Sequence, residues 1–233
     1  MQKTSFLRKL NQPETFAAFS GLLLALCYPR FAFGFLAWIA LVPLLFALAK
    51  AEGRNQALRC GLISGIIFFS ISLHWLTEVA FIGWVLWVLI QSVYFVVFAW
   101  LVYLYQKVQA SAILKALWTA CVWTLIEVVR SETPVIGVGW NLLAYSQALY
   151  PEVIQCANLF GAYGLGFLIV LVNACSAELI RPEKKRLKGK AAGLFSIILL
   201  ILWAVIFYGQ LNLAEEKRPE EYLRVSVLQG NIP

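Results

Sequence analysis

Apolar residues run along this chain in stretches that are each close to the length of a membrane crossing. A helix needs about 20 residues to cross the hydrocarbon core of a bilayer. Residues 15–49 form a run of 35, about 52 Å as one helix, which is room for two crossings that break near Tyr28, Pro29 and Arg30. Five further runs follow, at residues 57–76, 79–105, 112–129, 153–180 and 191–210.

These runs predict an all-α integral membrane protein, a bundle of about seven transmembrane helices. An open sheet cannot satisfy its backbone in hydrocarbon, so helices are the form that such runs take. The composition agrees, because 61% of the residues are hydrophobic and 13% are charged. Soluble domains are about 45–50% apolar and about 25% charged.

The basic residues predict the orientation of the bundle. With the N-terminus inside, the inner loops collect most of the 19 Lys and Arg, as the positive-inside rule requires. In a bacterium this places the N-terminus in the cytoplasm, the chain in the inner membrane and, after seven crossings, the C-terminal end in the periplasm. The net charge of +7 then faces anionic headgroups, and we expect no nucleic-acid partner.

Ionisable residues within spans are costly and tend to mark function. Glu127 and Arg130 lie three apart near an outer helix end, where they share one helix face. Two interpretations stay open: an ion pair that holds the helix end, or a contact of Arg130 with a phosphate headgroup. His74, the single histidine, is more typical of an interfacial residue beside Trp75 than of a metal ligand.

Two other features complete the pattern along the chain. Residues 131–150 mix Pro and Gly with aromatic and polar side chains, which fits either a re-entrant segment on the outer face or an ordinary loop. The five cysteines lie in apolar stretches without metal-type spacing, so we expect no metal site and no cofactor.

The end of the chain differs in composition from the apolar runs. Residues 1–212 hold the apolar runs, and residues 213–222 form a charged linker. Residues 223–233 combine β-forming residues with a Gln-Gly-Asn turn, which predicts the truncated start of a further domain.

Four motifs together resemble the bacterial apolipoprotein N-acyltransferases. Ile126–Arg130 (IEVVR) followed by GWNLLAYSQ at 139–147 is similar to that family's Glu…Arg and Trp…Tyr-Ser-Gln motifs. Residues 158–174 (NLFGAYGLGFLIVLVNA), 73–76 (LHWL) and 225–233 (VSVLQGNIP) look like three further family motifs. One departure is visible, since Val138 or Gly139 stands where the family often has Pro before the Trp.

The resemblance implies a membrane bundle joined to a periplasmic nitrilase-like α/β domain, usually with one last span. Such enzymes transfer an acyl chain from a phospholipid to the N-terminal diacylglyceryl-cysteine of a lipoprotein, using Cys, Glu and Lys of the nitrilase-like domain. No catalytic residue can be placed within these 233 residues, so the chain alone is expected to be inactive.

For the residues of this chain, the resemblance implies a role in binding lipid. Candidate residues around the headgroup or the domain junction are Trp75, Glu127, Arg130, Trp140, Tyr145 and Gln147. The expected partners are a phospholipid acyl donor and a lipoprotein acceptor within the membrane. The alternative is a non-enzymatic membrane protein that binds lipid or scaffolds a separate nitrilase-like partner.

Overall fold

A computed structural model describes residues 12–134, 137–180, 188–214 and 225–226, and every regular element among them is a helix. The α-helices are α2 (Pro13–Leu26), α3 (Val42–Lys50), α4 (Arg54–Ser72), α5 (Phe81–Gln106), α6 (Ala112–Glu132), α7 (Pro151–Ile154), α8 (Ala157–Leu179) and α9 (Lys188–Ala214). Three short 3-10 helices lie between them: η1 (Gly34–Trp38), η2 (His74–Glu78) and η3 (Leu143–Gln147). The prediction of an all-α membrane protein is confirmed.

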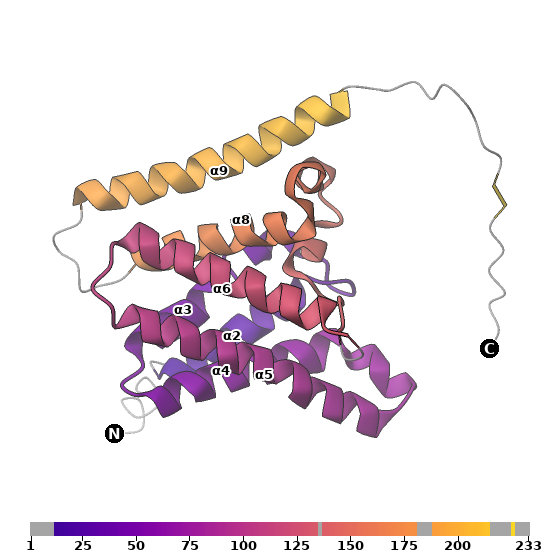
Figure 1. Ribbon diagram of the computed structural model, residues 1–233. Helices are drawn as coiled ribbons and strands as arrows, with labels where there is room; N and C mark the ends of the chain where they lie inside the picture. The colour runs from indigo at the N-terminus through magenta and orange to yellow at the C-terminus, as the bar shows by residue number, and fades with distance from the viewer. Residues whose placement is uncertain (1–11, 135–136, 181–187, 215–224, 227–233) are drawn as a thin grey trace, which may run out of the picture.

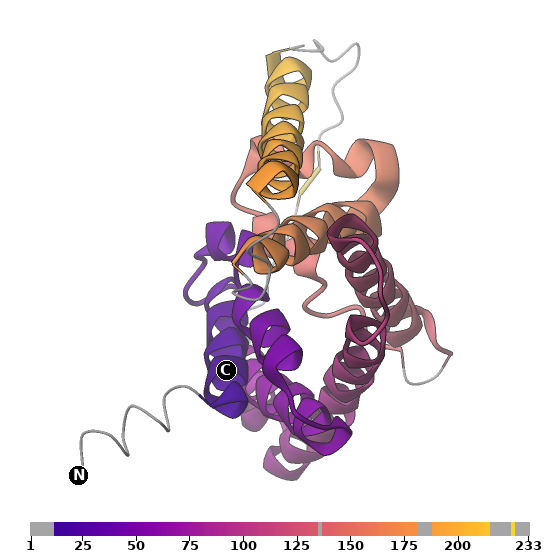
Figure 2. The same cartoon turned by 90° about the vertical axis from the view of Figure 1, so that its left-hand side faces the viewer.

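Six helices pack side by side into a closed ring. Around the ring α2 contacts α4, α4 contacts α5, α5 contacts α6, α6 contacts α8, α8 contacts α3, and α3 returns to α2. Figure 2 looks along the helix axes and shows this arrangement, with α9 outside it. The core of the ring consists of buried aliphatic and aromatic side chains, among them Leu24, Leu44, Leu48, Phe98 and Ile169.

α9 is the peripheral helix of the described structure. It crosses the top of Figure 1 and contacts α7 and α8. Its contact with α7 is close, because a Cβ atom on Gly209 would lie 1.7 Å from the carbonyl oxygen of Glu152. The rest of α9 presents apolar side chains outward, including Leu200 and Trp203, as expected of a helix that faces lipid.

The seven predicted runs correspond to helical segments, although their lengths differ. Within the part of the chain that the structure describes, four helices are long and apolar enough to cross a membrane, namely α5, α6, α8 and α9. The apolar helices Pro13–Leu26 and Gly34–Lys50 are shorter. α4 has 19 residues, and its first two turns carry Arg54 and Arg59. Pro13, which starts α2 at a position that tolerates proline, and the break after Leu26 keep the first helix short.

The predicted run at 153–180 divides into two helices. α7 ends at Ile154 and α8 begins at Ala157, and α8 itself bends at Gly161, which has φ of 67°. This backbone conformation is open to glycine and strained for other residues. A hydropathy pattern does not mark this break, because apolar residues stand on both sides of it.

The helix α9 reaches into the region where the sequence predicts a linker. α9 continues to Ala214, so helix covers the first two residues of the predicted linker at 213–222. Most of the predicted strand at 223–233 lies outside the described residues, and the division into domains stays a prediction.

Glycines allow α4 and α5 to approach closely. A Cβ atom on Gly61 would lie 2.5 Å from the carbonyl oxygen of Phe95 and 2.7 Å from Cβ of Ala99. One turn later, a Cβ atom on Gly65 would lie 3.0 Å from Cβ of Phe95. The GxxxG pattern of Gly61 and Gly65 therefore marks a helix contact, as such patterns commonly do in membranes.

We predict that Gly61→Ala destabilises the bundle. The added methyl group must push α5 away, and overpacking of this kind lowers the free energy of unfolding by about 1–3 kcal/mol. Thermal unfolding in detergent measures the effect. Gly193→Ala is the control, since a Cβ atom there meets nothing within 4 Å. Equal melting temperatures for the two variants would contradict the close packing of α4 on α5.

Candidate functional site

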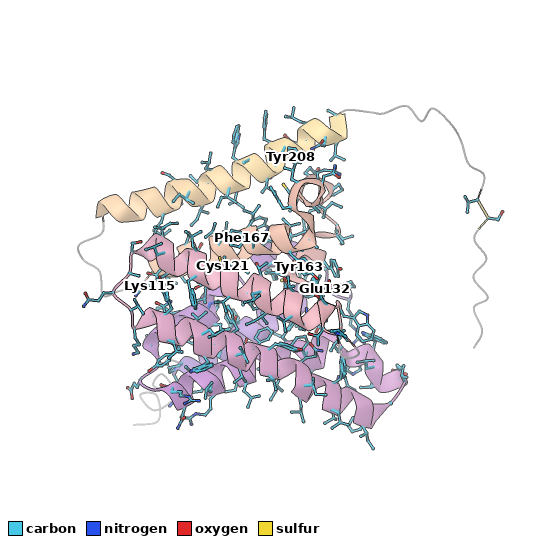
Figure 3. All side chains as sticks on the ribbon, in the orientation of Figure 1. Lys115, Cys121, Glu132, Tyr163, Phe167 and Tyr208 are labelled. Atoms are coloured by element: carbon cyan, nitrogen blue, oxygen red, sulfur yellow. The ribbon has the colours of Figure 1, made fainter. Side chains whose placement is uncertain are left out.

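The candidate residues gather at one end of the ring. α6 ends there, and the segment from Gly137 to Gln147 returns across the ends of α4, α6 and α8, as far as η1. Figure 3 places Glu132 and Tyr163 together at this end and Lys115 at the opposite end. The Tyr163 hydroxyl joins α8 to the end of α6, because it lies 2.6 Å from Oγ of Ser131 and donates to Glu132 at 2.5 Å.

Arg130 organises the first part of this returning segment. Its Nη1 donates to the carbonyl oxygens of Val138 (3.2 Å) and Trp140 (2.7 Å), and its Nη2 donates to that of Asn141 (3.4 Å). The guanidinium group also lies 5.9 Å from the centre of the Phe69 ring. Arg130 is only 5% exposed, so its donors serve the backbone of the segment.

Glu127 holds the next part of the segment from the same face of α6. Its Oε1 accepts a 2.7 Å hydrogen bond from the backbone N–H of Leu143, the first residue of η3. A carboxylate at the start of a helix satisfies one of the donors that the helix leaves open. Glu127 and Arg130 thus both form hydrogen bonds to the backbone of the returning segment.

Asn141 lies at the sharp turn between the two anchors. Its φ of 55° is in the left-handed region, which asparagine tolerates better than most residues. Its Nδ2 donates to Oγ of Ser72 at 3.0 Å, which ties the turn to α4. The hydroxyl of Tyr28 lies 3.0 Å from the carbonyl oxygen of Asn141 and 3.1 Å from that of Leu142.

Gln147 fastens the end of η3 to η1. Its Nε2 donates to the carbonyl oxygen of Gly34 at 2.8 Å, and its Oε1 accepts from Nε1 of Trp38 at 3.1 Å. The two backbones touch, since a Cβ atom on Gly34 would lie 2.0 Å from the carbonyl oxygen of Ser146. Only glycine fits at position 34.

The three other candidates are aromatic and point outward. Trp75 in η2 and Trp140 in the returning segment are each nearly half exposed, and their rings meet edge to face at 5.0 Å. Tyr145 in η3 is 50% exposed. The six candidates therefore form two groups: buried anchors (Glu127, Arg130, Gln147) and exposed aromatic residues (Trp75, Trp140, Tyr145).

A small cavity of about 20 Å³ lies beneath the returning segment. Its walls are mostly aromatic and come from α4, α5 and α6, with polar groups of Glu127, Arg130 and Asn141 at one side. The Oε2 atom of Glu127 and the Nε1 atom of Trp123 are both buried at this cavity. The cavity has room for about one water molecule.

Comparison with known proteins assigns the family. Residues 20–175 match the model of the apolipoprotein N-acyltransferase N-terminal domain. The chain belongs to the apolipoprotein N-acyltransferase family. The matched range contains the returning segment, all six candidate residues and the cavity.

Several relatives in this family align with nearly the whole chain. The apolipoprotein N-acyltransferase of Geobacter metallireducens is 32% identical over 227 residues, which cover 93% of this chain and 43% of the relative. That of Chlorobaculum tepidum is 29% identical over 97% of this chain and 42% of the relative. That of Thermotoga maritima is 35% identical over 71% of this chain and 35% of the relative. The chain thus spans less than half the length of these relatives.

The sequence did not reveal which residues form hydrogen bonds with the end of the returning segment. Tyr28, Gly34 and Trp38 precede Gln147 by more than 100 residues, so no local pattern connects them. Asn173 was quoted within a family motif without a role, yet it is fully buried and holds the start of α3. His74 is exposed and its ring lies 6.4 Å from that of Trp84; among the described residues no group of three metal-ligating side chains occurs.

We predict that Arg130→Met loosens the returning segment. The three carbonyl oxygens lose a charged donor, and hydrogen bonds to charged groups contribute about 1.5–3 kcal/mol each. Limited proteolysis within 137–147 and the melting temperature in detergent report the change. Arg130→Lys is expected to fall between wild type and Arg130→Met, because an ammonium group lacks the planar fork.

Lys107→Met is the matched control for this experiment. Lys107 is an exposed cation at the end of α5, far from the returning segment. Equal proteolysis of Arg130→Met and Lys107→Met would show that the guanidinium group does not hold the segment.

Proposed function

We propose that this chain is the membrane part of an enzyme that transfers an acyl chain from a phospholipid to the N-terminal diacylglyceryl-cysteine of lipoproteins. The observation that carries this proposal is the match of residues 20–175 to the N-terminal domain of the apolipoprotein N-acyltransferases. The catalytic Cys, Glu and Lys of such an enzyme belong to a nitrilase-like domain. The role of this chain is to hold the membrane-bound substrates beside it.

The two groups of candidate residues suit different parts of that role. Trp75, Trp140 and Tyr145 contact the headgroup region, where amphipathic aromatic rings are favoured. Glu127, Arg130 and Gln147 are positioning residues, which hold the aromatic groups and the domain junction in place.

The proposed setting is the bacterial inner membrane. The end of the ring with the returning segment faces the periplasm, and the end with Arg54, Lys107 and Lys115 faces the cytoplasm. This orientation follows the distribution of basic residues. It puts the aromatic group at the membrane surface where lipoproteins are processed.

We predict that the purified 233-residue chain does not transfer an acyl group. The test incubates it with phosphatidylethanolamine and a diacylglyceryl peptide, and mass spectrometry detects the acylated peptide. The Geobacter metallireducens relative is the positive control. Turnover comparable to that of the relative would refute the proposed division of labour. Copurification of a nitrilase-like polypeptide would favour the scaffold alternative or a split enzyme.

We also predict that the exposed aromatic residues contribute to phospholipid binding. Trp75→Ala combined with Trp140→Ala removes the rings that would contact the ethanolamine ammonium group, a cation–π contact of about 0.5–1 kcal/mol at an exposed site, so the Kd for phosphatidylethanolamine rises by about 2- to 5-fold. Titration of the detergent-solubilised chain with a fluorescent phosphatidylethanolamine measures it.

The control for this titration is Trp203→Ala, which removes an exposed tryptophan that stacks on Phe207 of α9. Equal Kd values for the double variant and the control would exclude the aromatic pair from lipid binding.

A further inference from the structure

The chain between α2 and α3 is irregular although its sequence is apolar. It contains turns, the short helix η1 and two non-glycine residues in the left-handed region, Arg30 with φ of 99° and Ala32 with φ of 59°. An irregular connection normally lies in water, because water satisfies its backbone groups. In hydrocarbon such a backbone is tolerated only where protein groups replace the water.

The chain between α2 and α3 lies short of the outer boundary of the hydrocarbon core. The ring of Tyr28 packs on that of Phe68, with 5.4 Å between centres. Phe68 follows Arg54, the first residue of α4, by 14 positions, which is about 21 Å along a helix. The hydrocarbon core is about 30 Å thick. With Arg54 at the inner boundary, Tyr28 is therefore about 9 Å short of the outer one.

Three buried side chains from three other elements satisfy the backbone of residues 34–41. Ser20 of α2 donates to the carbonyl oxygen of Ala40 at 2.6 Å, and Gln147 of η3 donates to that of Gly34 at 2.8 Å. Asn173 of α8 donates to the carbonyl oxygen of Ala37 at 2.8 Å and accepts from the N–H of Leu41 at 2.9 Å. None of these three side chains is more than 1% exposed.

The side chains that the same residues turn outward are large and apolar. Phe33 is 48% exposed, Phe35 56% and Ile39 52%. Side chains of the protein thus bind the backbone on the inner face of the segment. The exposed side chains Phe33, Phe35 and Ile39 on its outer face are apolar. Both faces have the character of a segment that is surrounded by lipid.

We propose that residues 33–39, which include the 3-10 helix η1, lie within the hydrocarbon core, with Phe33, Phe35 and Ile39 in contact with the acyl chains of the leaflet at the η3 end. Ser20, Gln147 and Asn173 take the place of water for its backbone. The occupant of this apolar face is lipid, because a face at this depth in a spanning bundle meets acyl chains. The inference depends on the membrane fold and is independent of acyl transfer.

Nitroxide labels at single cysteines test this depth. The labels are placed at Phe35→Cys and Ile39→Cys in a Cys121→Ser background, since Cys121 is the exposed one of the five cysteines. The chain is reconstituted in vesicles of phosphatidylethanolamine and phosphatidylglycerol. Paramagnetic broadening by oxygen, which enters lipid, is compared with broadening by a water-soluble nickel chelate.

Two reference positions define the scale. Val93→Cys in the middle of α5 is 55% exposed and reports hydrocarbon, and Val108→Cys in the loop after α5 is 48% exposed and reports water. Values near those of Val93 at both Phe35 and Ile39 are the expected result. A value near that of Val108 at either position overturns the proposal.

A charge at Phe35 gives a second measurement that does not need a label. Phe35→Asp is expected to lower the melting temperature of the chain in the same vesicles, whereas Val108→Asp is expected to leave it unchanged. An aspartate at position 35 that is tolerated as well as the one at position 108 overturns the proposal. If Phe35→Asp fails to fold, the labelled variants still decide the question.

Discussion

The site depends on one constraint, which is that backbone groups away from water must find partners within the protein. At the end of the ring that carries the returning segment, two irregular stretches of chain lie against each other. Arg130 and Glu127 supply partners to one of them, and Ser20 and Asn173 supply partners to the other. Gln147 belongs to the first stretch and bonds to the second, so the two are held as one unit.

The buried anchors and the exposed aromatic residues depend on each other. Trp140 is exposed because Arg130 binds its carbonyl oxygen from below and leaves the indole ring outside. Tyr145 likewise points outward from η3, whose first N–H is held by Glu127. Gly166 of α8 makes room for that carboxylate, since a Cβ atom there would lie 3.0 Å from Oε2. Three buried polar side chains, Glu127, Arg130 and Gln147, thus fix the position of the exposed aromatic residues at this end of the bundle.

The sequence predicts this architecture to different degrees at different places. Runs of apolar residues predict the long helices well, and the three-residue spacing of Glu127 and Arg130 correctly places both on one face of α6. The spacing does not reveal what the two side chains bind. Leu143 comes near Glu127, and Trp140 comes near Arg130, only because the chain turns at Asn141. The contacts of Gln147 with Gly34 and Trp38 span more than 100 residues and depend on closure of the ring. Breaks such as Gly161 are hidden because hydropathy is the same on both sides.

The position of α9 outside the ring has a mechanical consequence. Within the described residues the main contacts of α9 are with α7 and α8, so α8 is the one ring helix that packs extensively against it. At Gly209 the backbone of α9 comes so close to the carbonyl oxygen of Glu152 that a Cβ atom would lie 1.7 Å from it. The residues on either side of Gly209 carry side chains, so sliding α9 along α7 would bring one of them against this carbonyl oxygen. The glycine thus sets the register of α9 on α7, which follows the returning segment in the chain.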